Sequence, residues 1–494
     1  MRVKLIPLGA EIEVEPGASL ETALSAYGVE FPCGGAGICR GCRVRVLEGA
    51  IAITPEMEQV FTPAELAGGW RLACCSRAEG PLALEVAQWE MPILADDTPV
   101  PFEPAEGAGI AIDVGTTTVV AQAVDLATGE VLGVESVLNP QVVHGADLMS
   151  RIEFALAGGG PVLAAEIREA LAALLGGLPR GESVRVVMLA GNTAMHHLFC
   201  GIDVTPLASV PFRPVNDGEQ VFRPAELGWD LPREATVRFL PCLGGFVGSD
   251  LLAGIIATDI PGSTTLRALI DLGTNGEIVL GNSDRILCAS TAAGPAFEAG
   301  RIRMGMRAAT GAIAHVAFRN GALECRTIGE SATRGICGSG LVDAVAVGMD
   351  SGAILPSGRL AGGRREFLLA PPVAIAQSDI RELQLAKGAI AAGLRILAER
   401  WGASPRDIET LYLAGAFGNY VNVQNARRIG LLETSATRVV SAGNTSLRGL
   451  KMALLCASKR EQWIGRIRAR TEHVPLASDP HFQDTFAECL ALSG

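Results

Sequence analysis

The chain has 494 residues, of which 49% are hydrophobic and 19% are charged, and its formal net charge is -12. A chain of this length and apolar content can bury more than one core, which indicates two or three domains. The acidic balance disfavours nucleic acid and anionic membranes as partners, because binding them requires a basic stripe. No apolar run is long enough to span a membrane, and the first residues turn acidic before a signal-peptide core could form. A cytoplasmic protein without nucleic-acid or membrane partners is therefore expected.

Residues 1–92 are predicted to form a small mixed α/β domain around a cysteine-rich loop. Alternating apolar and polar residues predict strands at 2–8, 11–17 and 42–49, and the stretch 19–28 is expected to be a short helix. The loop PCGGAGICRGC lies between that helix and the third strand. The chemistry of the domain therefore depends on what its cysteines bind.

The cysteine spacing predicts an iron–sulfur cluster. Cys33, Cys39 and Cys42 follow the pattern Cys-x5-Cys-x2-Cys, and Cys74 or Cys75 offers a fourth thiolate about thirty residues later. Three close ligands and one distant ligand are the ferredoxin arrangement, whereas a zinc ribbon would show two separated Cys-x2-Cys pairs. The intervening glycines let backbone N–H groups approach the negative sulfides of a 2Fe-2S cluster. The sequence RLAC fits the ferredoxin pattern best and favours Cys74, while zinc binding and unligated thiols remain the alternatives.

The rest of the chain is predicted to form two similar lobes after a linker. Residues 93–108 are rich in proline and acidic residues and lack periodicity, which is typical of an interdomain linker. The segment GIAIDVGTTTVV then predicts a buried strand, a turn and a second strand, and LIDLGTNGEIVL repeats this pattern later in the chain. Duplication of the unit predicts one lobe at 109–262 and another at 263–494.

Each repeat carries a candidate phosphate loop, in which an aspartate ends a buried strand and a turn rich in glycine and threonine follows. Such an aspartate can hold a hydrated Mg2+, and the N–H and hydroxyl groups of the turn can surround phosphate oxygens. One turn of this kind is more often an ordinary hairpin, but two that face each other would clamp a polyphosphate. No P-loop or dinucleotide fingerprint competes with this interpretation. The first loop comprises Asp113, Gly115, Thr116 and Thr117, and the second comprises Asp271, Gly273, Thr274 and Asn275.

Three further segments could complete this site. LAGAFG predicts a strand that enters a glycine-rich bend, where Gly415 and Gly418 could admit a nucleoside, although a plain strand-to-helix turn is equally compatible. Glu277 could orient an attacking water, or it could be a solvated residue at a strand end. Gly294 and Gly338 could line the cleft, or they could serve tight helix packing.

The segments DVGTTT, DLGTNGE and LAGAFG resemble the two phosphate motifs and the adenosine motif of the superfamily of acetate and sugar kinases, heat-shock ATPases and actin. Further segments make the chain resemble, over nearly its whole length, the reductive activators of corrinoid-dependent enzymes. They are NPQVVHGADLMSRI, LAGNTAMHHLFCGID, GGFVGSDLLAG, STAAGPAFEAGRI, ICGSGLVDAV and QSDIRELQLAKGAI. The resemblance implies an N-terminal 2Fe-2S ferredoxin-like (β-grasp) domain followed by a two-lobed RNase H-like ATPase.

The same resemblance implies an ATP-hydrolysing enzyme that transfers one electron from a 2Fe-2S cluster to cobalt(II) of a corrinoid protein and so regenerates cobalt(I). Cys33, Cys39, Cys42 and Cys74 would hold the cluster, while the loop aspartates would organise Mg2+ and the turns would contact ATP. The implied partners are the corrinoid protein and an external low-potential electron donor, and a homodimer is left open. Three rival hypotheses are a sugar- or acetate-type kinase with a regulatory cluster, an ATP-coupled activator of another radical enzyme, and an electron carrier without catalysis.

Overall fold

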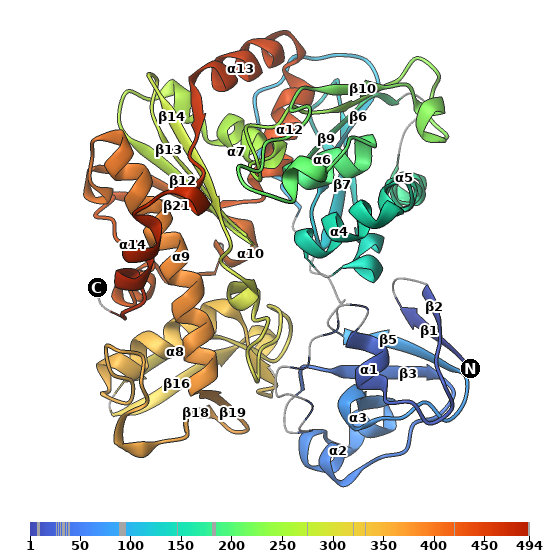
Figure 1. The fold of residues 1–494 in the computed structure, drawn as a ribbon, viewed down its shortest axis with the longest axis vertical. Coiled ribbons are helices and arrows are strands. Elements are labelled where there is room, and N and C mark those ends of the chain that lie inside the picture. The colour runs from blue at the N-terminus through green and yellow to red at the C-terminus, as the bar shows by residue number, and fades with distance from the viewer. Residues whose placement is uncertain are drawn as a thin grey trace.

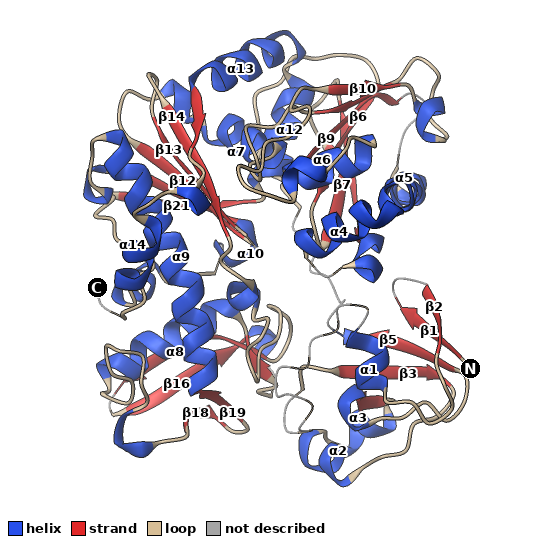
Figure 2. Cartoon of the chain, in the orientation of Figure 1, coloured by secondary structure: helices blue, strands red, loops and turns tan. Residues whose placement is uncertain are grey.

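The chain folds into an N-terminal domain and two larger lobes (Figure 1). In this computed structural model, strands and helices alternate along most of the chain and helices flank the sheets of both lobes (Figure 2). Within the described part of the chain, no helix combines the length and the apolar character that crossing a membrane requires. The structure describes residues 1–492 except 7–9, 26, 28, 30, 32–34, 36, 38–39, 88–94, 146, 180–183, 274, 320, 331 and 419.

The N-terminal domain is a five-stranded mixed sheet packed against a short helix. The strand order is β2-β1-β5-β3-β4, with β1 parallel to β5 and the other neighbours antiparallel. Val3 and Leu5, on the inner face of β1, are fully buried with Leu20 and Leu24 of α1. This arrangement confirms the expected β-grasp fold. The strands are β1 (Arg2–Ile6), β2 (Ala10–Glu13), β3 (Arg43–Glu48), β4 (Trp70–Leu72) and β5 (Leu82–Val86), and the helices are α1 (Leu20–Ser25), α2 (Pro55–Val60) and α3 (Pro63–Ala67).

The first lobe is built on a six-stranded sheet with the order β10-β11-β9-β6-β7-β8. Strands β6, β7 and β8 form an antiparallel meander, while β9 and β11 continue parallel to β6. The apolar sequence of β6 is almost wholly buried, as expected for a central strand. The strands are β6 (Ala108–Val114), β7 (Thr118–Asp125), β8 (Val131–Leu138), β9 (Val184–Gly191), β10 (Gln220–Phe222) and β11 (Thr236–Phe239), and the helices are α4 (Leu148–Phe154), α5 (Gly160–Gly177), α6 (Thr193–Cys200) and α7 (Ser249–Thr258).

The second lobe repeats this plan. Its sheet has the order β21-β20-β12-β13-β14-β22, in which β12, β13 and β14 are antiparallel neighbours and β20 and β21 run parallel to β12. The matching order and direction confirm that the strand-turn-strand unit of the sequence is duplicated. The sheets differ at their edges, because β10 lies beside β11 whereas β22 lies beside β14. The strands are β12 (Arg267–Leu272), β13 (Gly276–Gly281), β14 (Ile286–Thr291), β20 (Thr410–Ala414), β21 (Arg438–Gly443) and β22 (Thr471–His473).

A segment inserted between β14 and β20 adds two small sheets and two long helices to the second lobe. In Figure 1 it lies below the main sheet of that lobe, beside the N-terminal domain. Its elements are β15 (Ala312–Arg319), β16 (Ala322–Thr327), β17 (Gly335–Ile336), α8 (Gly338–Asp350), β18 (Glu366–Ala370), β19 (Val373–Ala376) and α9 (Gln377–Trp401). The remaining helices of the lobe are α10 (Gly415–Gly418), α11 (Val423–Arg428), α12 (Thr445–Leu455), α13 (Ala457–Arg470) and α14 (Phe482–Cys489).

Helices α7 and α12 pack against each other between the two large sheets. They share one apolar core with strands of both lobes, in which Leu252 and Leu450 of the helices meet Ala111 and Leu269 of the sheets. The α12 helix approaches α7 closely, since a side chain at Gly449 would collide with a backbone carbonyl of α7. This helix pair is therefore the element through which movement of one lobe reaches the other.

The segment between the N-terminal domain and β6 is fastened to α12. Asp96, only 4% exposed, pairs with Arg448 at 2.8 Å and with Lys451 at 3.2 Å. The Lys451 amino group also donates to the backbone oxygens of Asp96 and Thr98. The buried lysine and aspartate thus satisfy each other, as buried charges must.

Candidate nucleotide cleft and cluster site

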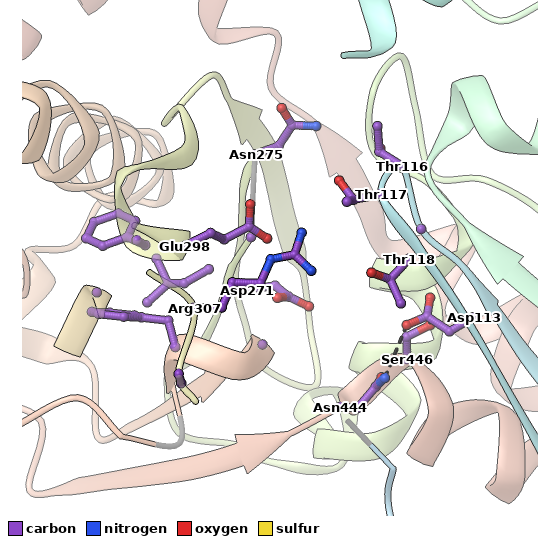
Figure 3. A pocket seen from close by; sticks show the side chains of 18 of the residues that line it. Asp113, Thr116, Thr117, Thr118, Asp271, Asn275, Glu298, Arg307, Asn444 and Ser446 are labelled. Atoms are coloured by element: carbon purple, nitrogen blue, oxygen red, sulfur yellow. Dashed lines mark hydrogen bonds between the residues drawn. The ribbon is translucent and has the colours of Figure 1, made fainter. Parts of the chain in front are cut away.

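A cavity of about 300 Å3 lies between the lobes, where β6 and β12 end. Its volume is at the lower end of the range for small-molecule sites. Figure 3 shows Thr116 and Thr117 of the first phosphate loop on one side and Asn275 and Asp271 of the second on the other. The predicted residues that line the cavity are Asp113, Gly115, Thr116, Thr117, Asp271, Gly273, Asn275, Glu277, Gly338 and Gly415.

Two predicted glycines lie outside the cavity wall. Gly294 precedes a turn that begins at Pro295, and it has no place among the lining residues. Gly418 ends α10 packed on the preceding strand, where an added Cβ would lie 2.8 Å from the Leu413 carbonyl oxygen. The alternative of a plain strand-to-helix turn therefore accounts for Gly418. Thr274, which was also predicted to contact phosphate, lies outside the described residues.

The aspartate of the first phosphate loop is held from the second lobe. Asp113 accepts hydrogen bonds from Ser446 Oγ at 3.0 Å and from Asn444 Nδ2 at 3.2 Å, both at the N-terminus of α12. Burial raises the pKa of Asp113 above its ordinary value, and these two hydrogen bonds oppose the rise. The contact couples the first loop to the helix that packs between the lobes.

Four further carboxylates line the cavity, and burial raises the pKa of three of them. Burial raises the pKa of Asp271 to about 7, and the negative charge of Asp113 adds to the rise. Burial likewise raises the pKa of Asp250 to about 7, with Asp113 again contributing. The pKa of Glu277 is raised well above its ordinary value by burial and then by the other carboxylates. Glu277 thus lies in the cavity wall and not at a solvated strand end.

A cavity that gathers carboxylates in this way suits a divalent cation. Near neutral pH such groups retain protons until a cation displaces them. Among the described residues, no three potential ligands are grouped closely enough to hold a metal by themselves. Mg2+ usually takes one or two carboxylates and completes its shell with waters and phosphate oxygens, so two of the cavity carboxylates are enough to hold it.

Several lining residues were not predicted as site residues. Asn192 caps α6 and donates from Nδ2 to Thr116 Oγ1 at 3.0 Å, which fixes the first phosphate loop. Asp250 stands at the N-terminus of α7, after a glycine-rich stretch that shares no pattern with the repeats. Glu298 and Arg307 project from the second lobe (Figure 3). Arg307 brings a positive charge to a cavity that otherwise gathers carboxylates.

The bend after β20 closes the cavity on the second-lobe side. Gly415 has a φ of +81°, and an added Cβ would lie 2.8 Å from the Leu272 carbonyl oxygen and 2.9 Å from Asp271 Oδ1. Only glycine allows the bend to come so near the second phosphate loop. Phe417 and Phe297 lie in the same wall with ring centroids 4.8 Å apart, an apolar surface on which a nucleotide base can pack.

In the described part of the cysteine site, the turn with Cys74 and Cys75 lies close to Cys42 of the cluster loop. The Ala73 N–H donates to the Cys42 carbonyl oxygen at 3.0 Å, so the turn that carries Cys74 and Cys75 lies against the cluster loop. The Sγ atoms of Cys74 and Cys75 are 3.6 Å apart. At Gly37, where φ is +69°, an added Cβ would lie 2.7 Å from Cys75 Sγ. The cradle thus requires glycine, as a cluster loop does.

These thiols are the donors that a 2Fe-2S cluster requires, and the described half of the site fits that group. Cys33 and Cys39 lie outside the described residues. It is Cys75 Sγ that lies beside Gly37 of the loop, and the assignment of Cys74 as fourth ligand stays a prediction.

Comparison with known families covers most of the chain. Residues 3–79 match the 2Fe-2S iron-sulfur cluster binding domain, residues 108–263 match the RACo middle region, and residues 265–494 match the C-terminal domain of RACo, the ASKHA domain. The last match overlaps both the second phosphate loop and the glycine-rich bend.

Two curated proteins resemble the chain over most of its length. The corrinoid activation enzyme RamQ of Eubacterium limosum is 37% identical over 415 residues, which are 76% of this chain and 69% of that protein. The [Co(II) methylated amine-specific corrinoid protein] reductase of Methanosarcina barkeri is 28% identical over 411 residues, 76% of each chain. Among solved structures, a reductive activator for corrinoid,iron-sulfur protein superposes with a TM-score of 0.69 at 26% identity, covering 99% of this chain and 98% of that one.

Proposed function

Because the chain belongs to the family of ATP-dependent reductive activators of corrinoid proteins, we propose that it returns the cobalt(II) of a corrinoid protein to cobalt(I). One electron is transferred per cobalt, and an external low-potential donor replaces it. The observation that carries this proposal is the fusion of a ferredoxin-type cluster domain to a cleft with two facing phosphate loops. When bound, the 2Fe-2S cluster supplies a one-electron centre and Mg-ATP supplies free energy.

The need for ATP follows from redox energetics. Plant-type 2Fe-2S centres have reduction potentials of about -400 mV, and corrinoid cobalt(II) is expected to have a more negative potential. Raising one electron by 100 mV requires about 2.3 kcal/mol. A nucleotide can provide this only by binding one conformation of the protein better than another. The two lobes, joined through α7 and α12, are the parts that can differ between those conformations.

The residues of the cleft have distinct proposed roles. Asp113 and Asp271 position the waters around the cation from opposite lobes, while Thr116, Thr117 and Asn275 contact the phosphates. Glu277, whose pKa is raised by burial and by the neighbouring carboxylates, orients the attacking water. Each of these side chains reaches the cavity, which is the geometric support for the assignment.

The direct test follows the cobalt(I) absorption band. The anaerobically reduced protein is mixed with a corrinoid protein that holds cobalt(II), with and without Mg-ATP, and the band is expected only with Mg-ATP. Cys42→Ser should abolish the band while ATP hydrolysis persists. Cys325→Ser, which changes a half-buried thiol on β16, should behave as wild type. A band that forms equally well without nucleotide would contradict the ATP coupling, and phosphorylation of a small molecule without cobalt(I) would favour the kinase hypothesis.

A further inference from the structure

One wall of the nucleotide cavity is fastened to strand β17. Met306, Arg307 and Ala308 line the cavity in the loop before β15. The Met306 N–H donates to the Ile336 carbonyl oxygen at 2.9 Å, and the Ile336 N–H donates to the Met304 carbonyl oxygen at 2.9 Å. Any displacement of this wall by a bound nucleotide is therefore passed to β17.

Arg334 immediately precedes β17 and reaches the N-terminal domain. Its N–H donates to the Gly311 carbonyl oxygen at 2.9 Å, and its side-chain stem lies directly over Gly311. Its Nη2 atom lies 3.6 Å from Glu65 Oε1 on α3, an ion pair whose side chains are 29% and 19% exposed. A residue fixed to the cavity wall thus contacts the cluster domain.

Glu65 carries this contact on to the cluster loop. Its Oε1 atom also pairs with Nη2 of Arg40, which stands between Cys39 and Cys42 in the sequence. Its Oε2 atom accepts the Thr62 N–H at 2.9 Å in the capping box that begins α3. Glu65 is therefore held in place by its own helix while it faces two arginines.

Arg40 depends on Glu65. Its side chain is almost completely buried, and its guanidinium lies 5.0 Å from the centre of the Phe61 ring. A buried cation that loses its anion carries a large desolvation penalty, so the Arg40 contact is the one that stays closed. The contact of Glu65 with Arg334 is more exposed, and it can open at a smaller free-energy change.

The N-terminal domain also rests on the first lobe. Leu138 and Val142, 1% and 6% exposed, belong to the same apolar cluster as the core of the N-terminal domain. Between them, Asn139 donates from Nδ2 to the Gly115 carbonyl oxygen and from its N–H to the Thr117 carbonyl oxygen, each at 2.9 Å. The cluster domain therefore contacts both lobes. It makes an apolar contact with Leu138 and Val142 of the first lobe and an ion pair with Arg334 of the second.

We propose that Arg334 is a positioning residue that passes the nucleotide state of the cleft to the cluster loop through Glu65 and Arg40. The inference rests on the proposed function, because it requires that nucleotide rotates one lobe against the other. A domain that contacts both lobes cannot keep both contacts during such a rotation. The apolar contact at Leu138 and Val142 is buried, whereas a partly exposed ion pair is worth at most about fivefold in an equilibrium constant, so the ion pair is the contact that opens.

The test uses the full-length protein with its cluster incorporated and compares Arg334→Gln with wild type. The EPR spectrum and midpoint potential of the cluster are measured with and without Mg2+ and a non-hydrolysable ATP analogue. Wild type is expected to change both on nucleotide binding, and Arg334→Gln is expected to lose most of each change. Arg334→Lys, which keeps the charge, should restore at least about half of them.

A matched control separates this role from a general effect of removing an arginine. Arg319→Gln changes an exposed arginine on β15 of the same small sheet, whose pairing with Glu324 spans 4.0 Å, and should respond to nucleotide as wild type does. A titration with a fluorescent ATP analogue should give a Kd for Arg334→Gln that is equal to the wild-type value or up to about fivefold tighter, because nucleotide binding no longer has to open the ion pair.

Three results would overturn the inference: a wild-type response in Arg334→Gln, no nucleotide response in wild type, or an Arg334→Gln Kd weakened more than about tenfold, which would indicate a damaged cleft. A failure of wild type to form cobalt(I) would instead count against the proposed function. The two failures are therefore distinguishable.

Discussion

The two phosphate loops occupy equivalent positions in the two lobes, yet their aspartates are held differently. Asp113 receives hydrogen bonds from Ser446 and Asn444 at the N-terminus of α12. Within the described residues, no such bond reaches Asp271, and burial raises its pKa to about 7. The two lobes thus share the same phosphate loop, but in the described part of the chain only the aspartate of the first loop receives hydrogen bonds from the N-terminus of α12. The pKa of both aspartates is raised by burial, but among the described residues only at Asp113 do side-chain hydrogen bonds oppose the rise and favour the carboxylate.

Replacing Asp271 with asparagine should have the largest effect. A neutral amide cannot balance the cation, so Mg2+-dependent ATP hydrolysis should fall at least about 100-fold. The visible spectrum of the cluster should not change, because the cysteine loop belongs to another domain. Asp284→Asn, in the exposed turn after β13, is the control. A loss of less than about tenfold would show that ATP hydrolysis does not need the second loop, and it would contradict the role assigned to Asp271.

Closing the space beside the second loop should have the next largest effect. Gly415→Ala places a Cβ against Leu272 and Asp271 at a φ of +81°, so the free energy of unfolding should fall by about 1–3 kcal/mol. Gly402→Ala, at the C-terminus of α9, has a similar φ of +85° in the left-handed helical region but no neighbour within 4 Å, so it should show the backbone penalty alone, about 1 kcal/mol. Urea denaturation measures both. Equal losses would mean that the close approach at Gly415 is unimportant.

The raised pKa values predict a pH dependence. Burial raises the pKa of Asp271 and of Asp250 to about 7, so affinity for Mg-nucleotide should fall below that pH, by up to about tenfold per pH unit for each proton displaced. Calorimetric titration between pH 6 and 8 measures this. An affinity that does not change over this range would contradict the proton exchange assigned to the second loop.

The unbound protein should show the opposite trend in stability. The folded-state pKa of about 7 exceeds the ordinary value of 3.8, so the folded state binds more protons between these values. The free energy of unfolding contributed by these groups should therefore decrease as pH rises from about 4 to 7. Thermal melts without Mg2+ measure this, and added Mg2+ should raise Tm more at pH 8 than at pH 6.

The smallest expected effect concerns the first loop. Ser446→Ala removes one donor from Asp113, which should raise the pKa of Asp113 further and weaken Mg-nucleotide binding about three- to tenfold. Ser435→Ala, at an exposed turn far from the cleft, should bind as wild type does. If Ser446→Ala binds unchanged, the asymmetry between the loops does not depend on α12.

The features that the sequence predicted correctly are those whose signals are local. A buried strand, a turn and a second strand lie within about twenty residues, so the repeats at Asp113 and Asp271 could be compared directly, and both reach the cavity. The cysteine spacing likewise identified the cluster domain that the family match supports. Its strands at 2–8, 11–17 and 42–49 were located to within a few residues.

The features that the sequence could not predict depend on contacts between distant segments. Asn444 and Ser446 are more than 300 residues from Asp113, and nothing in a helix N-terminus indicates which loop it will face. Asp250 belongs to α7 and has no counterpart in the repeat pattern. The glycines were ambiguous for another reason: close packing and ligand approach both favour glycine, and only the fold showed that Gly415 faces the cavity while Gly418 packs on β20.

The ion pairs of Asp96 with Arg448 and Lys451 limit how far the cluster domain can move away from the two lobes. The domain ends at residue 87 and the chain is next anchored at residue 96. About nine residues can span at most about 30 Å, so a cluster domain that left the lobes would remain within that radius of α12. Its effective concentration at the lobes would stay high, and it would return to them far faster than a separate ferredoxin could. A tethered cluster domain of this kind can contact a bound partner and then be reduced again while it remains attached to the lobes.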